Sequence, residues 1–221
     1  MTPCGRIATG WRLLILCLSV VAAPAQQSAP IVQPGAPGQP SRILSESIAR
    51  TPPKAPSRAD IEFMQGMIMH HSQAVDMVAL LRTRGKSPAL KAFGEKIAIS
   101  QTDEIRFMKQ WLESHGEPTT MRMDHSHMSA AEMKNMNMLM PGMLTPEQMK
   151  ALAKARGAQF DHLFLTGMIQ HHGGALTMVD DLFKTPGAGQ DPVLFDFATD
   201  VDNTQTAEIR IMRAMIEKER R

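Results

Sequence analysis

The sequence predicts an all-α protein, a four-helix bundle built from two duplicated helical hairpins with a Met/His-rich insert between them. A nineteen-residue segment beginning at Asp60 recurs without a gap from Asp161, with ten identical positions. About 30 residues after each copy a second motif matches, Gln101-Thr-Asp-Glu against Gln205-Thr-Ala-Glu. Helical spacing within the segments and helix start and stop signals between them complete the prediction.

Residues 1–25 have the composition of a secretory signal peptide. Arg6 and Arg12 precede a short apolar run, which ends in the small-residue sequence Ala23-Pro24-Ala25. The apolar run is shorter than the roughly 20 residues that a membrane-spanning helix needs. We therefore expect a periplasmic or secreted protein with no membrane segment after signal cleavage.

The composition of the remaining chain excludes several classes of function. Cleavage would remove Arg6, Arg12 and both cysteines, Cys4 and Cys17, so that 24 basic residues become 22, against 22 acidic residues. A chain without net charge is a poor partner for nucleic acid. Without cysteine it forms no disulfide, thiolate metal site or iron–sulfur cluster. Any metal ligands must therefore be His, Met, Asp or Glu.

Residues 26–56 are rich in Pro, Gln, Ser, Ala and Gly. Such a segment buries too little apolar surface to offset the entropy lost on ordering, and it predicts a disordered tether. The helical domain is expected over residues 57–221. It begins at Ser57, where Ser-Arg-Ala-Asp resembles a capping box.

The first repeat has the spacing of one helix face, because seven of its positions are spaced 3, 4, 3, 1, 3 and 3 residues apart. These positions are Asp60, Phe63, Met67, His70, His71, Ala74 and Met77. Two antiparallel hairpins with such faces pack most simply as a four-helix bundle whose repeated faces point inward.

Capping residues and prolines predict the helix boundaries. Gly85 and Ser87-Pro88 separate the first two helices. Thr145-Pro146-Glu147-Gln148 opens the third helix, which Thr185-Pro186-Gly187 closes. Asp191-Pro192 then opens the fourth helix.

Two histidine pairs are the main candidate site. His70-His71 follows Met67 by one helical turn, and His171-His172 follows Met168 in the same way. Buried imidazoles without partners are costly to desolvate, and histidines are most often gathered to bind metal. The alternative is that they are core histidines, hydrogen-bonded on the facing helices to Glu104, Glu208, Gln101 and Gln205.

The ligand types favour copper. Thioether and imidazole without thiolate select copper, with Cu(I) preferring Met and Cu(II) preferring His. The insert at residues 116–144 adds eight Met and two His, and we interpret it as a copper-capturing loop. Its candidate ligands are Met121, Met123, His125, His127 and Met128. Packing explains the helically spaced Met133, Met136 and Met140, and we assign to the core Met64, Met77, Met178, Met212 and Met215.

The repeated pattern Asp-x-x-Phe-x-x-x-Met-x-x-His-His-x-x-Ala-x-x-Met, followed by Gln-x-x-Glu-Ile-x-x-Met, resembles the DUF305 family of secreted bacterial proteins. Its members include the CopM-type periplasmic copper-binding proteins. The resemblance covers residues 57–218 and implies a ferritin-like four-helix bundle that binds or buffers copper outside the cytoplasm. It places in the metal-binding role Met67, His70, His71, Met168, His171 and His172.

Three functions remain open. The first is a non-catalytic copper metallochaperone or sequestration protein, whose partners are copper ions and then other copper-handling proteins. The second is a ferritin-like metal-dependent oxidoreductase, which is disfavoured because the Glu-x-x-His pairs of di-iron bundles are missing. The third is a structural or interaction bundle without metal. With no nucleophile–base motif and no phosphate-binding loop, we expect a protein that is not an enzyme.

Overall fold

A computed structural model describes residues 32–33, 40–43, 55–121 and 139–219. The chain divides into two compact units, Met1–Pro52 and Pro53–Arg221. In the first unit β1 (Val32–Gln33) pairs antiparallel with β2 (Arg42–Ile43), within the segment expected to be a tether. The predicted signal peptide and most of that tether lie outside the described residues.

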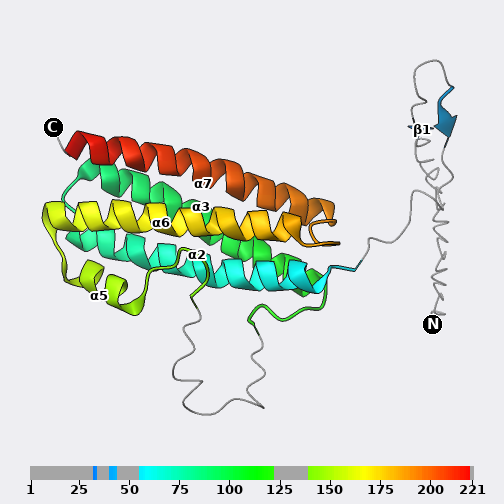
Figure 1. The fold of residues 1–221 in the computed structure, drawn as a ribbon, viewed down its shortest axis with the longest axis horizontal. Coiled ribbons are helices and arrows are strands. Elements are labelled where there is room, and N and C mark those ends of the chain that lie inside the picture. Colours follow the sequence, from blue (N-terminus) through cyan, green and yellow to red (C-terminus); the bar gives the residue numbers. More distant parts are fainter. Residues whose placement is uncertain (1–31, 34–39, 44–54, 122–138, 220–221) are drawn as a thin grey trace, which may run out of the picture. The chain divides into compact units, whose positions relative to one another are not determined.

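Four long helices form the second unit: α2 (Arg58–Arg84), α3 (Pro88–Ser114), α6 (Gly157–Lys184) and α7 (Pro192–Glu219). Figure 1 shows them side by side as a bundle. Within each hairpin α2 packs on α3 and α6 on α7, and the repeat helices α2 and α6 pack on each other. The predicted ferritin-like four-helix bundle of two hairpins is confirmed. Among the described residues, no helix has the length and apolarity needed to cross a membrane.

Most of the predicted helix starts are present as side-chain caps. The Ser57 hydroxyl accepts a hydrogen bond from the Asp60 backbone N–H, and the Asp60 carboxylate accepts one from the Ser57 N–H, which completes the capping box. Ser87 caps α3, with Pro88 at the first helical position. These caps satisfy backbone donors that helix starts leave free.

One predicted boundary was wrong. Thr145 and Gln148 do form a capping box, but it opens a separate nine-residue helix, α5 (Pro146–Lys154). The backbone is extended at Ala155 and Arg156, and Gly157 has a φ of 61°, in the left-handed region that favours glycine. The helical path breaks there, and α6 begins only at Gly157.

The aspartates that start the two repeats tie the hairpins together. Asp161 on α6 is buried, and its carboxylate accepts the backbone N–H groups of Lys86 and Ser87, in the loop of the first hairpin. Asp60 on α2 is buried as well, and it accepts the N–H of Gly189, in the loop of the second hairpin. Each repeat therefore caps the loop of the other.

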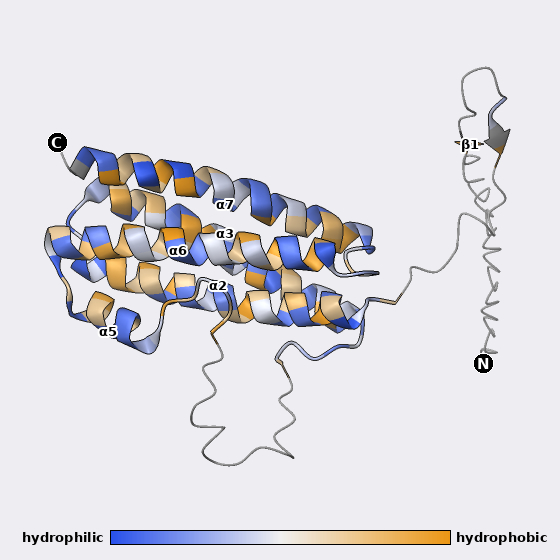
Figure 2. Ribbon diagram, in the orientation of Figure 1, coloured by the Kyte–Doolittle hydropathy of each residue, from blue (hydrophilic) through white to orange (hydrophobic). Residues whose placement is uncertain are grey.

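The apolar core forms two clusters, one on each side of the middle of α2 and α6. The first contains Phe63 of α2 and Val179 of α6, and the second contains Val78 of α2 and Phe164 of α6. Figure 2 shows both hydrophobic and hydrophilic residues along each helix, as amphipathic packing requires. Of the methionines assigned to the core, three are fully buried and two are half-buried against it: Met64, Met77 and Met212, then Met178 and Met215.

Candidate metal centre

Four fully buried histidines form one layer between the two apolar clusters. His70 and His71 come from α2, and His171 and His172 come from α6. The ring centroids of His70 and His171 are 3.8 Å apart, and each lies 6.1 Å from the ring of its neighbour in the chain. The two pairs predicted from the repeat are thus brought together in one centre.

The outer two histidines are oriented by carboxylates. Nε2 of His71 lies 2.6 Å from Oε2 of Glu104 on α3, and Nε2 of His172 lies 2.6 Å from Oε2 of Glu208 on α7. Burial alone would raise the pKa of Glu104, but the hydrogen bond and charge of His71 and the hydrogen bond from Ser100 bring that pKa below its usual value. The carboxylate therefore accepts, and the Nε2 of His71 donates.

The inner two histidines donate to backbone carbonyls. Nε2 of His70 lies 3.0 Å from the oxygen of Pro141, and Nε2 of His171 lies 2.8 Å from the oxygen of His70. A carbonyl oxygen only accepts, so both rings carry a proton on Nε2. Burial, reinforced by the charge of His71, lowers the pKa of His70 to about 3. Burial, and the repulsion that a protonated His70 would add, hold the pKa of His171 well below its usual value, so both rings are neutral.

In all four rings Nδ1 is buried and makes no hydrogen bond within the described part of the chain. A neutral imidazole protonated at Nε2 has a lone pair at Nδ1. Buried polar atoms without partners are rare, and each one calls for an explanation. The lone pairs at Nδ1 of His70 and His171 are therefore candidate metal ligands, and the unpartnered Nδ1 atoms of His71 and His172 lie in the same layer.

The alternative of hydrogen-bonded core histidines accounts for only one nitrogen of each ring. The predicted partners Glu104 and Glu208 are confirmed. Gln101 and Gln205 were wrong as partners, because their buried side-chain amides hydrogen-bond to nothing in the described ranges. In the part of the chain that the structure describes, no group of three or more His, Cys, Asp or Glu is arranged to hold a metal ion. A metal here would need a smaller set of imidazoles or a mixed set with thioethers.

The predicted thioether ligands are placed unequally. Met67 and Met168 are fully buried, but Met67 belongs to the first apolar cluster and Met168 to the second, on opposite sides of the histidine layer. Their ligand role stays a prediction. Met121 is half-buried beside α2. The other predicted ligands of the insert lie outside the described residues: Met123, His125, His127 and Met128.

Sequence reasoning missed the turn that covers the layer, at Pro141 and Gly142. A Cβ on Gly174 would lie 1.8 Å from the Pro141 oxygen, so only glycine lets the turn reach His70. Gln73 holds the following residues, because its amide donates to the oxygen of Leu144 and accepts from the N–H of Leu144. The sequence did contain a sign of this turn, because the second repeat has a glycine, Gly174, at the position where the first repeat has Gln73.

Fold and site together define a duplicated four-helix bundle with a buried His–Glu layer. The chain belongs to the DUF305 family, described as a domain of unknown function, whose sequence model matches residues 60–216.

Solved structures of this family are similar to the chain. A DUF305 protein from Streptomyces coelicolor is 29% identical with a TM-score of 0.60, covering 72% of this chain and 93% of that one. A DUF305 fragment from Deinococcus radiodurans is 25% identical with a TM-score of 0.61, covering 75% and 99%. CopM in its Cu(II)-bound form is 28% identical with a TM-score of 0.55, covering 72% and 96%.

CopM has also been solved with Cu(I) bound, and that structure is 26% identical to this chain with a TM-score of 0.53. A curated relative, an uncharacterized protein of Acanthamoeba polyphaga mimivirus, is 39% identical over 54 residues. The match spans 24% of this chain and about a third (36%) of that relative.

Proposed function

We propose that this protein binds copper outside the cytoplasm and holds Cu(I) in the histidine layer. The observation that carries the proposal is the set of four buried Nδ1 atoms without hydrogen-bond partners. Their rings are already fixed through Nε2, as ligating histidines commonly are when their second nitrogen donates to a carboxylate or a carbonyl. The similarity to CopM, solved with Cu(I) and with Cu(II), supports copper as the metal.

The donor atoms favour copper over magnesium and manganese. Magnesium and manganese would require more carboxylate. Imidazole suits zinc as well as copper, so the choice of copper rests on the similarity to the copper-bound forms of CopM. Glu104 and Glu208 are engaged by His71 and His172, so they orient the layer and balance its charge. A buried ion is costly to desolvate, and the cost is lower for a monovalent ion than for a divalent one. This favours Cu(I) in the interior.

The proposed role is transport or sequestration. The rings are fixed by hydrogen bonds and fully buried, which suits holding an ion away from water. The basic and apolar amino-terminal segment supports a periplasmic or secreted location. Copper ions are the proposed cargo, and other copper-handling proteins are the proposed donors or acceptors. No catalytic step is proposed.

X-ray absorption of the Cu(I)-loaded mature chain tests the proposal by distinguishing nitrogen from sulfur ligands. We expect nitrogen scattering from imidazole that is lost in the His70→Gln/His171→Gln variant. The exposed His162 provides the control, because His162→Gln should leave the spectrum unchanged. Equal nitrogen scattering in all three proteins would contradict the proposal.

A second measurement needs no substitution, so it tests the site even where the double variant does not fold. In ¹⁵N-labelled wild-type protein, the Nδ1 resonances of the buried imidazoles should shift when Ag(I), a stable substitute for Cu(I), is added. Unchanged Nδ1 resonances at saturating Ag(I) would overturn the site without any substitution.

A further inference from the structure

The side-chain ends of three methionines meet above Gly66 on α2. A Cβ on that glycine would lie 3.4 Å from Cε of Met121, Sδ of Met140 and Cε of Met178 alike. No two of these three atoms can therefore be further apart than twice that distance. All three side chains are half-buried, so the cluster lies at the surface of the bundle and not in its core.

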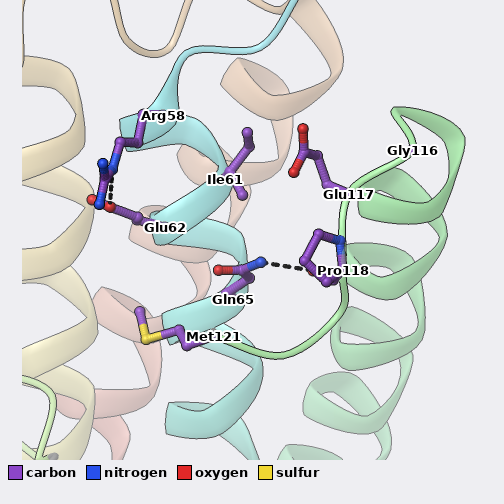
Figure 3. Close-up of a pocket in the computed structure, with 8 residues that line it drawn as sticks. All are labelled: Arg58, Ile61, Glu62, Gln65, Gly116, Glu117, Pro118 and Met121. Atoms are coloured by element: carbon purple, nitrogen blue, oxygen red, sulfur yellow. Dashed lines mark hydrogen bonds and ion pairs between the residues drawn. The ribbon is translucent and has the colours of Figure 1, made fainter. Parts of the chain in front are cut away.

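The three methionines come from separate segments that are anchored independently. Met178 is on α6. Met121 precedes residues 122–138, and the Gln65 amide holds the approach to it by donating to the Pro118 oxygen at 2.7 Å. Figure 3 shows this hydrogen bond, with the thioether of Met121 close to Gln65. Met140 starts the turn that Gln73 fixes through Leu144.

The internal repeat provides a comparison for this cluster. Gly167 is the repeat equivalent of Gly66, and Met77 is the equivalent of Met178. A Cβ on Gly167 would meet two methyl carbons of Leu144, at 3.0 and 3.5 Å, and Cε of Met77 at 3.3 Å. Leucine methyl groups thus fill the space beside Gly167 in the second repeat. Packing beside Gly66 in the first repeat therefore does not require the thioethers of Met121 and Met140.

We propose that Met121, Met140 and Met178 form a second metal site, which takes a soft monovalent cation such as Cu(I). Thioethers are ligands for Cu(I), and they need no deprotonation to bind it. The cluster shares no residue with the histidine layer, and its half-buried position leaves it open to an incoming ion. Met140 also directly precedes Pro141, whose carbonyl orients His70. The site therefore stands beside the turn that covers the interior centre.

Methionine-methyl NMR of the full mature chain tests this site, with Ag(I) as the probe. The Cε methyl resonances, assigned by single Met→Leu variants, should shift together for Met121, Met140 and Met178 over the same range of added Ag(I). Met178→Leu should lower the Ag(I) affinity that the other two methyls report by at least about tenfold. Loss of an outer-shell partner alone already costs about 10- to 100-fold in metal affinity.

Met77→Leu is the matched control, because it changes the equivalent position of the other repeat and should leave the three resonances unaffected. If Met178 only packs, Met178→Leu will leave the Ag(I) response of Met121 and Met140 unchanged, which overturns the proposal. Methyls that respond at different equivalents overturn it too. Repeating the titration in His70→Gln/His171→Gln separates the two sites, because the methionine response should persist there.

Discussion

His171 donates its Nε2 proton to the backbone oxygen of His70, 2.8 Å away across the contact between α2 and α6. The duplication would make this bond reciprocal, yet His70 donates to Pro141 instead. The repeat symmetry is broken at the centre of the site. Pro141, at the end of the insert, accepts the hydrogen bond that symmetry would direct to the backbone oxygen of His171. The two halves of the centre are thus equivalent in composition and different in the acceptor of the inner hydrogen bond.

Replacing Glu104 with Gln should weaken Cu(I) binding by about 10- to 100-fold, because the carboxylate raises the basicity of the ring that it orients. Competition against a chromogenic Cu(I) chelator measures the affinity. Glu113→Gln, an exposed position on the same helix, is the control and should behave like wild type. Equal affinities for Glu104→Gln and the wild type would remove the carboxylate from the site.

The adjacent glycines of α6 should respond in opposite directions to alanine. Gly174→Ala places a Cβ against Pro141 and should lower the free energy of unfolding by about 1–3 kcal/mol. Gly173→Ala meets nothing within 4 Å and should raise it by roughly 0.5–1 kcal/mol, since alanine favours helix. Urea unfolding compares the two variants. If both substitutions change the free energy of unfolding in the same direction, the close contact between Pro141 and Gly174 is contradicted.

Acid should destabilise the metal-free protein. The pKa of His70 is lowered to about 3 in the folded chain, whereas an unfolded histidine titrates near 6.5. Between these values the unfolded chain binds the extra proton, so the free energy of unfolding is fully retained above about pH 6.5 and falls as the pH is lowered. His171 and Glu104, whose pKa values are also lowered, act in the same direction.

The limiting slope is about 1.4 kcal/mol per pH unit for each such histidine. Urea titrations of the metal-free protein between about pH 7.5 and 4.5 cover most of the window between the two histidine pKa values. His70→Gln should flatten the pH dependence. A free energy of unfolding that rises toward acid would contradict the neutral assignment of the inner rings.

Asp161→Asn should destabilise the fold by about 1–3 kcal/mol, because a buried carboxylate that accepts two backbone N–H groups would be replaced by a weaker acceptor. Cu(I) affinity should stay within error of wild type, since Asp161 binds a loop. Asp202→Asn, at an exposed position of α7, is the control for stability. Loss of copper affinity in a folded Asp161→Asn protein would show that this aspartate serves the site.

The repeat made much of this protein predictable, because each segment carries its own helical spacing and its own caps. The inward position of His70 and His171 and the glutamate partners of the outer pair follow from that spacing. The break before Gly157 was missed because the Thr145 cap begins a helix, and nothing in its first turn indicates how long that helix is.

Other features depend on contacts between distant segments, which periodicity cannot indicate. The Pro141 carbonyl reaches His70 only because Gly174 lacks a side chain. In the same way, Met178 has the spacing of a core residue, and its neighbours Met121 and Met140 become visible only when the chain is folded. Gln101 and Gln205 were partners in the alternative interpretation of core histidines because they lie on the facing helices, but their side-chain amides make no hydrogen bond to the rings.

The protonation of the inner rings has a consequence for exchange of cargo. Metal binding commonly releases protons, because the ligands must first lose them. His70 is neutral down to about pH 3 and keeps its proton on Nε2, where Pro141 accepts it. An ion bound at its Nδ1 would therefore displace no proton, and the proposed loading and release of copper at this ring would neither acidify nor buffer its surroundings.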